Sequence, residues 1–265
     1  DNLLISGFVG VISAGVYSNY YLVIGSVRQV LDQALQGVTA SVGNLGATED
    51  GEKVGHVFAD LFFIGQWMFG FAGICLLEML NPFVELAFGK QYLFTEDIVL
   101  ILCINFFVTG TRRAVLIFKE SMGLFWYDRY KSLIEAVLNL GISILLVENL
   151  GIAGVFLGTL CSTLLTSFWV EPYVLYKHRF HENPVKFFLK YAWHLIVMAA
   201  VWGLTHVCCR WYEGGALGNL LFRFAICMVV PNVLLLLCYC RTAECKDFLR
   251  LLKRMGSKVL GRIKG

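Results

Sequence analysis

Charged residues are scarce in this sequence. They make up 15% of the chain, hydrophobic residues make up 58%, and the mean hydropathy is +0.69. A soluble globular domain carries about 25% charged residues, and less than half of its residues are apolar. The composition therefore excludes an ordinary soluble domain, and the long apolar runs are interpreted first as membrane-spanning helices.

The motifs of common enzymes and metal sites are also missing. The nine cysteines include no CxxC spacing, and most lie in apolar runs, which is typical of buried hydrophobic side chains. There is no Gly-rich phosphate loop, zinc motif or nucleophile elbow, and the basic C-terminal segment lacks the interleaved aromatic residues of a nucleic-acid binder. We therefore expect no enzyme activity, no cofactor or metal, and no nucleic-acid partner.

The start of the chain shows no signal peptide, because an apolar stretch follows Asn2 directly and no basic segment precedes it. The first residue is also not Met. We expect this sequence to be a piece of a longer protein, cut just before or inside a membrane helix.

The apolar runs predict the fold class, because a bilayer core of about 30 Å requires roughly 20 apolar helical residues. We expect an all-α integral membrane protein, a polytopic bundle of about eight membrane helices with the first one truncated. The expected spans are 3–12, 16–45, 57–80, 98–118, 132–147, 152–176, 191–209 and 217–239. Ser13-Ala14-Gly15 is the preferred break between the first two. The alternative is a single span over 3–24 followed by an interfacial helix.

Lysine and arginine are distributed very unevenly between the connections. Eighteen of the 22 lie in alternate segments, namely 46–56, 112–131, 177–190 and the tail 241–265. The intervening connections hold only Lys90 and Arg210. The positive-inside rule therefore predicts a multi-pass plasma-membrane protein with these four segments, including the C-terminus, in the cytoplasm.

The tail has helical periodicity of its own. Apolar and basic residues alternate as on a basic amphipathic helix, which favours contact with the anionic lipids of the cytoplasmic leaflet over binding to a calmodulin-like partner. The apolar positions are Phe248, Leu249, Leu252, Met255 and Val259, and the basic ones are Lys246, Arg250, Lys253, Arg254 and Lys258.

Polar residues inside the spans are the candidates for function, because charge in the bilayer core is costly. The second span carries one polar and small-residue face, made of Ser18, Gly25, Arg28, Asp32, Gln36, Thr39 and Gly43. Arg28 and Asp32 are four residues apart, so they could simply neutralise each other and hold two helices together. The functional interpretation is an arginine that binds phosphate oxygens through its planar fork.

Other spans repeat this pattern near their cytoplasmic ends. Arg112 and Arg113 follow Asn105 and Thr109 at helical spacing, and the simpler interpretation is that both arginines extend to lipid headgroups. Glu135 lies one turn from the cytoplasmic end of the fifth span and could be an interfacial or paired carboxylate. We treat three histidine and arginine residues as isolated and assign them no chemistry: His194, His206 and Arg223.

Several separated motifs resemble polysaccharide flippases of the multidrug/oligosaccharidyl-lipid/polysaccharide exporter superfamily. The resemblance covers roughly residues 1–180, and the last two spans more weakly. The motifs are DNLLIS at 1–6, GVYSNYY at 15–21, TASVGN at 39–44, FKESMGLFWYDRYK at 118–131 and GIAGVFLGT at 151–159.

The resemblance implies two six-helix lobes around a basic cavity, with two further C-terminal helices. Residues 1–176 would then be the second lobe, with its first helix truncated. Residues 177–240 would be the two added helices, and residues 241–265 would be a cytoplasmic tail. The partner lobe would precede this piece in the same polypeptide. The implied cargo is an undecaprenyl-diphosphate-linked oligosaccharide, moved between membrane leaflets. Carried onto this sequence, the resemblance gives four candidates for binding the diphosphate: Arg28, Arg112, Arg113 and Lys119. Three carboxylates are candidates for coupling transport to an H+ or Na+ gradient, or for orienting an arginine: Asp1, Asp32 and Glu135.

Two alternatives remain open. One is a multidrug cation antiporter of the same superfamily, whose site would favour acidic and aromatic side chains over an intramembrane arginine. The other is a membrane enzyme that acts on lipid-linked sugars, although such enzymes tend to carry large external loops, and the longest external connection here is only about 81–97.

Overall fold

The computed structural model describes residues 2–49, 51–212 and 214–263, with backbone alone for Ala47 and residues 254–263. Helices make up 88% of the structure, and the described residues contain no β-strand. In this part of the chain six helices are long and apolar enough to cross a membrane, which confirms the predicted all-α polytopic bundle. They are Gly51–Phe88, Glu96–Ser121, Lys131–Leu150, Ile152–Phe180, Val185–Cys209 and Ala216–Tyr239.

The element order follows the eight predicted spans, several of which are interrupted. The N-terminal elements are α1 (Asn2–Leu4), η1 (Ile5–Val9), α2 (Val11–Gln36) and α3 (Thr39–Thr48). The middle elements are α4 (Gly51–Phe88), η2 (Lys90–Tyr92), α5 (Glu96–Thr111), α6 (Arg113–Ser121), η3 (Leu124–Trp126) and α7 (Lys131–Leu150). The C-terminal elements are α8 (Ile152–Leu165), α9 (Ser167–Leu175), η4 (Tyr176–Phe180), α10 (Val185–Cys209), α11 (Ala216–Tyr239) and α12 (Ala243–Ile263).

The first break in the chain is at Gly10, so the expected break at Ser13-Ala14-Gly15 is wrong. Gly10 has φ 118° and its N–H donates to the carbonyl of Ile5 at 2.9 Å, whereas α2 runs without interruption through residues 13–15. Positive φ is available to glycine at little cost, while Ser and Gly inside a helix cost about 1 kcal/mol or less each, which packing overrides. The expected second span, 16–45, is likewise divided, because α2 ends at Gln36 and α3 begins at Thr39.

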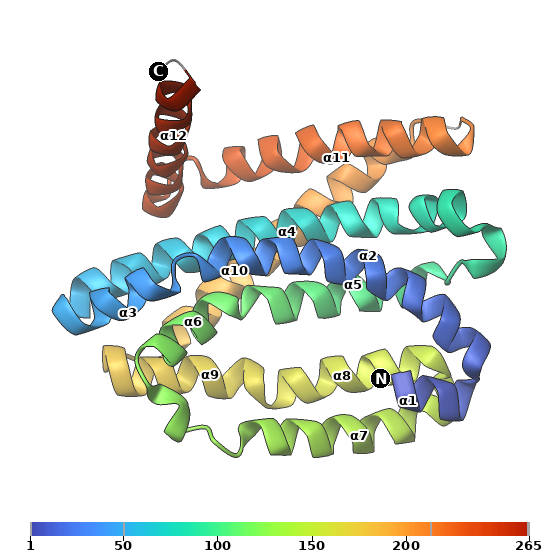
Figure 1. Ribbon diagram of the computed structural model, residues 1–265, viewed down its shortest axis with the longest axis horizontal. Coiled ribbons are helices and arrows are strands. Elements are labelled where there is room, and N and C mark those ends of the chain that lie inside the picture. Colours follow the sequence, from blue (N-terminus) through green and yellow to red (C-terminus); the bar gives the residue numbers. More distant parts are fainter. Residues whose placement is uncertain (1, 50, 213, 264–265) are drawn as a thin grey trace.

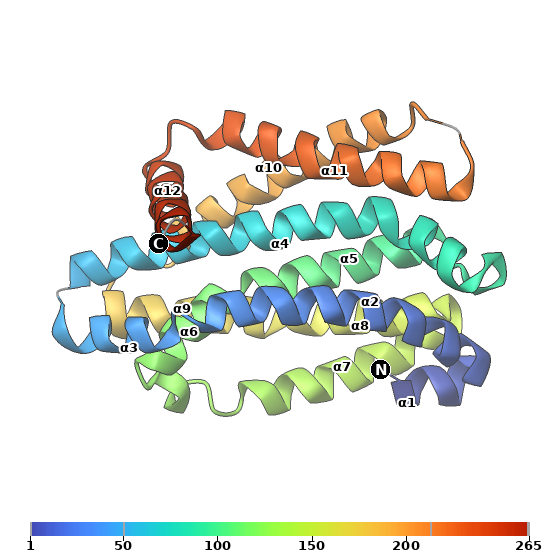
Figure 2. The same ribbon diagram turned by 45° about the horizontal axis from the view of Figure 1, so that its top comes forward.

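Helix α4 lies at the centre of the bundle, with α2 and α5 along one side and α10 and α11 along the other (Figures 1 and 2). Helices α7 and α8 form an antiparallel hairpin through Gly151, whose φ is 56°. A Cβ on Gly158 would lie 2.8 Å from the Cα of Ser143, so the two backbones approach closely only because this position has no side chain. The tight hairpin brings the polar residues of α7 against those of α8 and α9.

The four connections that are rich in lysine and arginine all lie at one end of the bundle. In Figure 1 this is the left end, which contains α3, η3, η4 and α12. Helix α12 follows the left end of α11, lies against α4 and points away from the bundle in Figure 1, and Phe248 packs against Trp67 of α4 with ring centroids 5.6 Å apart. Leu249 and Leu252 are exposed, whereas the side chains of Met255 and Val259 lie outside the described residues. The alternation of charge along the sequence therefore corresponds to a physical asymmetry of the fold.

An ion pair ties α12 to the bundle. The ammonium of Lys190 on α10 donates a hydrogen bond to Glu244 at the start of α12. Burial by itself would raise the pKa of Glu244, but the Lys190 ammonium outweighs it and holds that pKa below its ordinary value. The start of the tail is thus part of the folded structure.

Gln66 is an anomaly of the core and permits a stability prediction. Its side chain is 1% exposed, and neither its Oε1 nor its Nε2 has a hydrogen-bond partner in the part of the chain that the structure describes. An unsatisfied buried amide costs about 1–3 kcal/mol. We expect Gln66→Leu to raise the midpoint of thermal unfolding in detergent, with Gln66→Glu as the control that lowers it. A lower midpoint for Gln66→Leu would show that the amide is hydrogen bonded through water.

Candidate functional site

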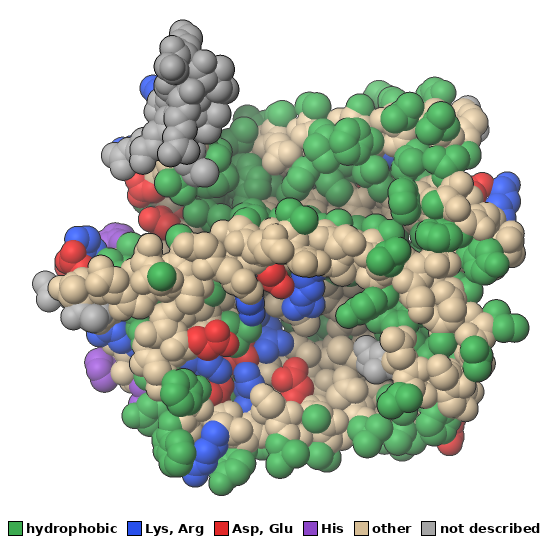
Figure 3. Space-filling model, viewed as in Figure 1, with side chains coloured by type: hydrophobic (Ala, Val, Ile, Leu, Met, Phe, Trp, Pro, Cys, Tyr) green, Lys and Arg blue, Asp and Glu red, His purple; other side chains and the backbone are tan. Residues whose placement is uncertain are grey.

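A hollow that contains most of the intramembrane charge lies below α2, between α2 and α7. Figure 3 shows lysine, arginine, aspartate and glutamate side chains gathered there, and the other charged side chains on this face lie mainly toward its edges. Six of the seven candidate residues from the sequence have ion pairs within 4.0 Å in this region: Arg28, Asp32, Arg112, Arg113, Lys119 and Glu135. We call this group of residues, with the partners described below, the charged network.

Glu171 is the most deeply buried member of the charged network. Its side chain has no exposed surface, although it lies in the apolar segment that ends at Phe180. Arg112 binds it with two hydrogen bonds, from Nε to Oε2 at 3.0 Å and from Nη2 to Oε1 at 2.7 Å. The ammonium of Lys131 donates to the same carboxylate. A buried carboxylate that receives two cations satisfies the requirement that charge inside a membrane be paired.

The network continues from Lys131 toward the end of the bundle. Lys131 lies 3.6 Å from Asp128, and Lys119, buried on α6, donates a hydrogen bond to the same aspartate. Lys119, a weaker candidate from the sequence, is therefore held by a carboxylate and is only 6% exposed in its side chain. It is a structural cation in this conformation.

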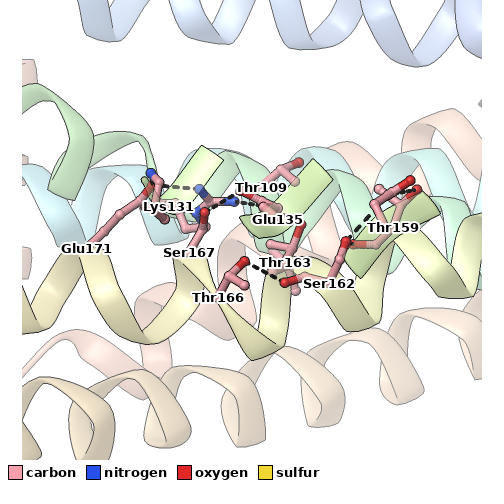
Figure 4. Close-up of polar contacts among 12 residues, drawn as sticks. Thr109, Lys131, Glu135, Thr159, Ser162, Thr163, Thr166, Ser167 and Glu171 are labelled. Carbon is pink, nitrogen blue, oxygen red and sulfur yellow. Dashed lines mark hydrogen bonds and ion pairs between the residues drawn. The ribbon is translucent and has the colours of Figure 1, made fainter. Parts of the chain in front are cut away.

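Glu135 occupies the next level of the network, where α7 faces α8 and α9. It accepts hydrogen bonds from the hydroxyls of Thr163, at 2.9 Å, and Ser167, and its Oε1 lies 4.0 Å from the guanidinium of Arg112. In Figure 4 the labelled polar side chains form a row along the facing surfaces of these helices. Farther along the row, Asn139 donates to Thr159 at 3.0 Å.

Arg28 is the most accessible arginine of the network. Its side chain is 42% exposed; Nη1 donates to Thr109 at 3.0 Å, and Nε lies 3.7 Å from Asp32. Asp32 also lies 3.4 Å from Nε of Arg113, so a single carboxylate is shared by two arginines. The expected pair of Arg28 and Asp32 therefore exists, but it is not a closed one-to-one pair. Arg28 keeps nitrogens available to an anion in the hollow.

The interpretation of Arg112 and Arg113 as residues that extend to lipid headgroups is wrong, because both pair with carboxylates inside the bundle. Their helix is interrupted at Arg112, where α5 ends and α6 begins, and this change of direction presents the two guanidinium groups to different partners. Asp1 lies outside the described residues. The network as a whole contains five cations and four carboxylates: Arg28, Arg112, Arg113, Lys119 and Lys131, and Asp32, Asp128, Glu135 and Glu171.

Three members of this network were missed by sequence reasoning. Asp128 and Lys131 lie in a stretch that was interpreted as a loop, and their partners are on other helices. Glu171 had a usable signal, because it is the only acidic residue in the expected span 152–176. A lone carboxylate in an apolar run demands a cation from a neighbouring helix.

A second polar cluster lies at the opposite end of the bundle, and it corrects the view that His206 and Arg223 are isolated. Both contact Glu78 of α4, at 2.9 Å from His206 Nδ1 and 3.2 Å from Arg223 Nη1. His194 also has a partner, since its Nδ1 lies 2.6 Å from the hydroxyl of Tyr239. Among the described residues no group of three His, Cys, Asp or Glu side chains is arranged to hold a metal ion.

The fold and the charged network together define a multi-pass α-helical membrane protein with a paired but accessible set of charges between its helices. A scan against protein-family models and searches of curated proteins and of solved structures found no match to this chain.

Proposed function

We propose that this chain is part of a flippase that moves a lipid-linked oligosaccharide, joined to undecaprenyl diphosphate, across the plasma membrane for cell-surface polysaccharide synthesis. The observation that carries the proposal is Arg28, a 42% exposed arginine between membrane helices, which pairs among the described residues with a single carboxylate, Asp32, that a second arginine shares. A diphosphate is the ligand that suits such a group, because guanidinium forks bind phosphate oxygens in pairs.

The charge balance of the network also favours an anionic cargo. Five cations face four carboxylates, so an arriving diphosphate meets net positive charge, and Asp32 can stay with Arg113 when Arg28 turns to the ligand. In this proposal residues 1–176 form one lobe of a two-lobe transporter, and the hollow of Figure 3 faces the other lobe. The basic end of the bundle is the cytoplasmic end, and an H+ or Na+ gradient drives the cycle through Asp32 or Glu135.

The proposal is tested by the lipids that the protein retains. The intact protein is purified in mild detergent and its bound lipids are identified by native mass spectrometry, in parallel with Arg28→Gln. We expect diphosphate-linked prenyl sugars on the unaltered protein and about tenfold less on the variant, since one charge-assisted hydrogen bond contributes about 1.5 kcal/mol or more.

The matched control is Lys186→Gln, which removes a cation whose side chain is 76% exposed at the same end of the bundle. This control should retain the lipids at the level of the unaltered protein. Equal retention by Arg28→Gln would contradict the role of Arg28. A protein without such lipids that instead takes up cationic dyes would favour the multidrug antiporter.

A further inference from the structure

A cavity of about 650 Å3 lies between α4, α5, α10 and α11, at the end of the bundle away from the basic connections. It is separate from the charged network, which lies on the other side of α4. Charged residues of both signs line it, among them Glu78, Glu96, Asp97, Arg210 and Arg223. The proposed transport of a diphosphate lipid makes no use of this cavity.

The floor of the cavity is rigidly built around Glu78, which is only 2% exposed. Its Oε1 accepts from Trp202 Nε1 at 3.0 Å and lies 2.9 Å from His206 Nδ1. Arg223 completes the arrangement, since Nη1 donates to Oε2 at 3.2 Å and to the backbone carbonyl of Glu78 at 3.1 Å. Glu78 is thus satisfied by the protein, and its role is to hold Arg223 in place.

Arg223 retains donors for a ligand. Its Nε donates to Asn219 at 3.0 Å and its Nη1 is used by Glu78, whereas no described residue accepts a hydrogen bond from its Nη2. Arg210, at the end of α10, is exposed and has no ion pair within the described part of the chain. These two guanidinium groups provide a basic wall with unused donors.

The opposite wall is acidic. Glu96 and Asp97 form the first turn of α5, both are exposed, and neither has an ion pair among the residues that the structure describes. Arg223 is paired with Glu78 and Glu85 with Lys90, whereas Arg210 on one wall and Glu96 and Asp97 on the other have no ion pair among the described residues. A small zwitterion whose two charges are close together would match both walls at once.

The cavity opens where a membrane surface is expected. Trp211 and Tyr212 directly follow Arg210 and are 81% and 41% exposed, and aromatic residues are enriched at the headgroup level of a bilayer. The same two helices that contribute Trp202, His206, Asn219 and Arg223 to the cavity also carry exposed apolar side chains: Leu204 and Val207 on α10, and Leu217 and Leu221 on α11. Acyl chains can lie against these residues while a headgroup enters the cavity.

We infer that this cavity binds a phosphoethanolamine headgroup, with its phosphate on Arg210 and Arg223 and its primary ammonium on Glu96 and Asp97. A primary ammonium donates three hydrogen bonds, which carboxylates accept. A choline headgroup has no such donors, and a glycerol headgroup has no positive charge, so the acidic wall discriminates against both. The source of the headgroup is a lipid of the leaflet away from the basic connections, or a soluble phosphoethanolamine compound.

The experiment measures binding of phospholipids by native mass spectrometry on the intact protein in delipidating detergent. Phosphatidylethanolamine, phosphatidylcholine and phosphatidylglycerol with identical acyl chains are titrated separately. We expect phosphatidylethanolamine to bind about tenfold more tightly than the other two, and Arg210→Gln and the double variant Glu96→Gln/Asp97→Asn each to remove that preference. Equal binding of the three lipids would overturn the inference.

Two controls complete the design. The substituted residues Glu96, Asp97 and Arg210 are all exposed, so the variants should unfold at the same temperature as the unaltered protein. Lys186→Gln, at the other end of the bundle, should leave the lipid preference intact. Soluble glycerophosphoethanolamine is then added as a competitor. Displacement of the lipid shows that the headgroup alone is sufficient, and failure to displace it shows that the lipid is the source. A lipid preference that persists in both variants would contradict the assigned walls.

Discussion

Glu171→Gln should be among the most destabilising single substitutions in this chain, at about 3–5 kcal/mol of unfolding free energy. The Glu171 side chain is fully buried and receives both Arg112 and Lys131, whose side chains are only 13% and 10% exposed. The neutral amide keeps the shape of the carboxylate but leaves two buried cations with one carboxylate fewer. The measurement is equilibrium unfolding of the purified protein in mixed micelles.

The matched control is Glu182→Gln, which removes a carboxylate that is 53% exposed and pairs with Lys186 at 3.2 Å. Exposed pairs contribute little, so this variant should lie within about 0.5 kcal/mol of the unaltered protein. Adding Lys131→Met to Glu171→Gln should recover part of the loss, because it removes one of the two cations that lost Glu171 and leaves Asp128 to Lys119 alone. Equal stability of the Glu171 and Glu182 variants would show that the Glu171 site is open to water.

The cations of the charged network differ in how closely they are paired with a carboxylate. Lys119 is buried, Arg112 and Lys131 are only 13% and 10% exposed in their side chains, and each of the three contacts a carboxylate at hydrogen-bond distance. The Arg28 side chain is 42% exposed, and its nearest carboxylate oxygen, on Asp32, lies 3.7 Å from Nε. The three closely paired cations stabilise the bundle, because removal of their partner leaves buried charge, and Arg28 can exchange its weak protein contact for a ligand. Function is therefore expected from Arg28, the most exposed of these four arginine and lysine side chains.

The fold class could be predicted from the sequence because it depends on sums over long segments. Hydropathy marks the spans, and the distribution of lysine and arginine marks the ends of the bundle. An error of a few residues in a helix boundary therefore has little effect on the predicted fold class or topology. The position of the first break was not predictable in the same way. Gly10 and Gly15 are equally able to adopt positive φ, and only the packing of the surrounding helices decides that Gly10 does so.

The candidate site was predictable only along single helices. Arg28 and Asp32 are four residues apart, so helical geometry alone places them together. Partners on different helices cannot be found in this way, because hydropathy gives the depth of a residue in the membrane but not the direction in which it faces. Glu171 and Glu78 belong to this class, and each gathers cations from helices that are distant in the sequence.

Arg28→Gln should reduce transport of a diphosphate-linked lipid by about 10- to 100-fold, the range that corresponds to about 1.5–3 kcal/mol for hydrogen bonds to a charged group. The substitution removes the accessible guanidinium while Asp32 keeps Arg113 at 3.4 Å, so no carboxylate is left without a cation. Unfolding stability should therefore change by no more than about 0.5 kcal/mol. Transport is measured as leaflet exchange of a labelled lipid-linked diphosphate sugar in liposomes that contain the intact protein.

Arg28→Lys separates the geometry of the side chain from its charge. Lysine retains the positive charge but lacks the planar fork that binds two phosphate oxygens together, so this variant should lie between Arg28→Gln and the unaltered protein. Full activity of Arg28→Lys would show that charge alone is required and that bidentate binding is not used. If Arg28→Gln instead transports at the unaltered rate but unfolds more easily, Arg28 is a structural partner of Asp32 and Thr109, and the diphosphate must be held elsewhere in the hollow.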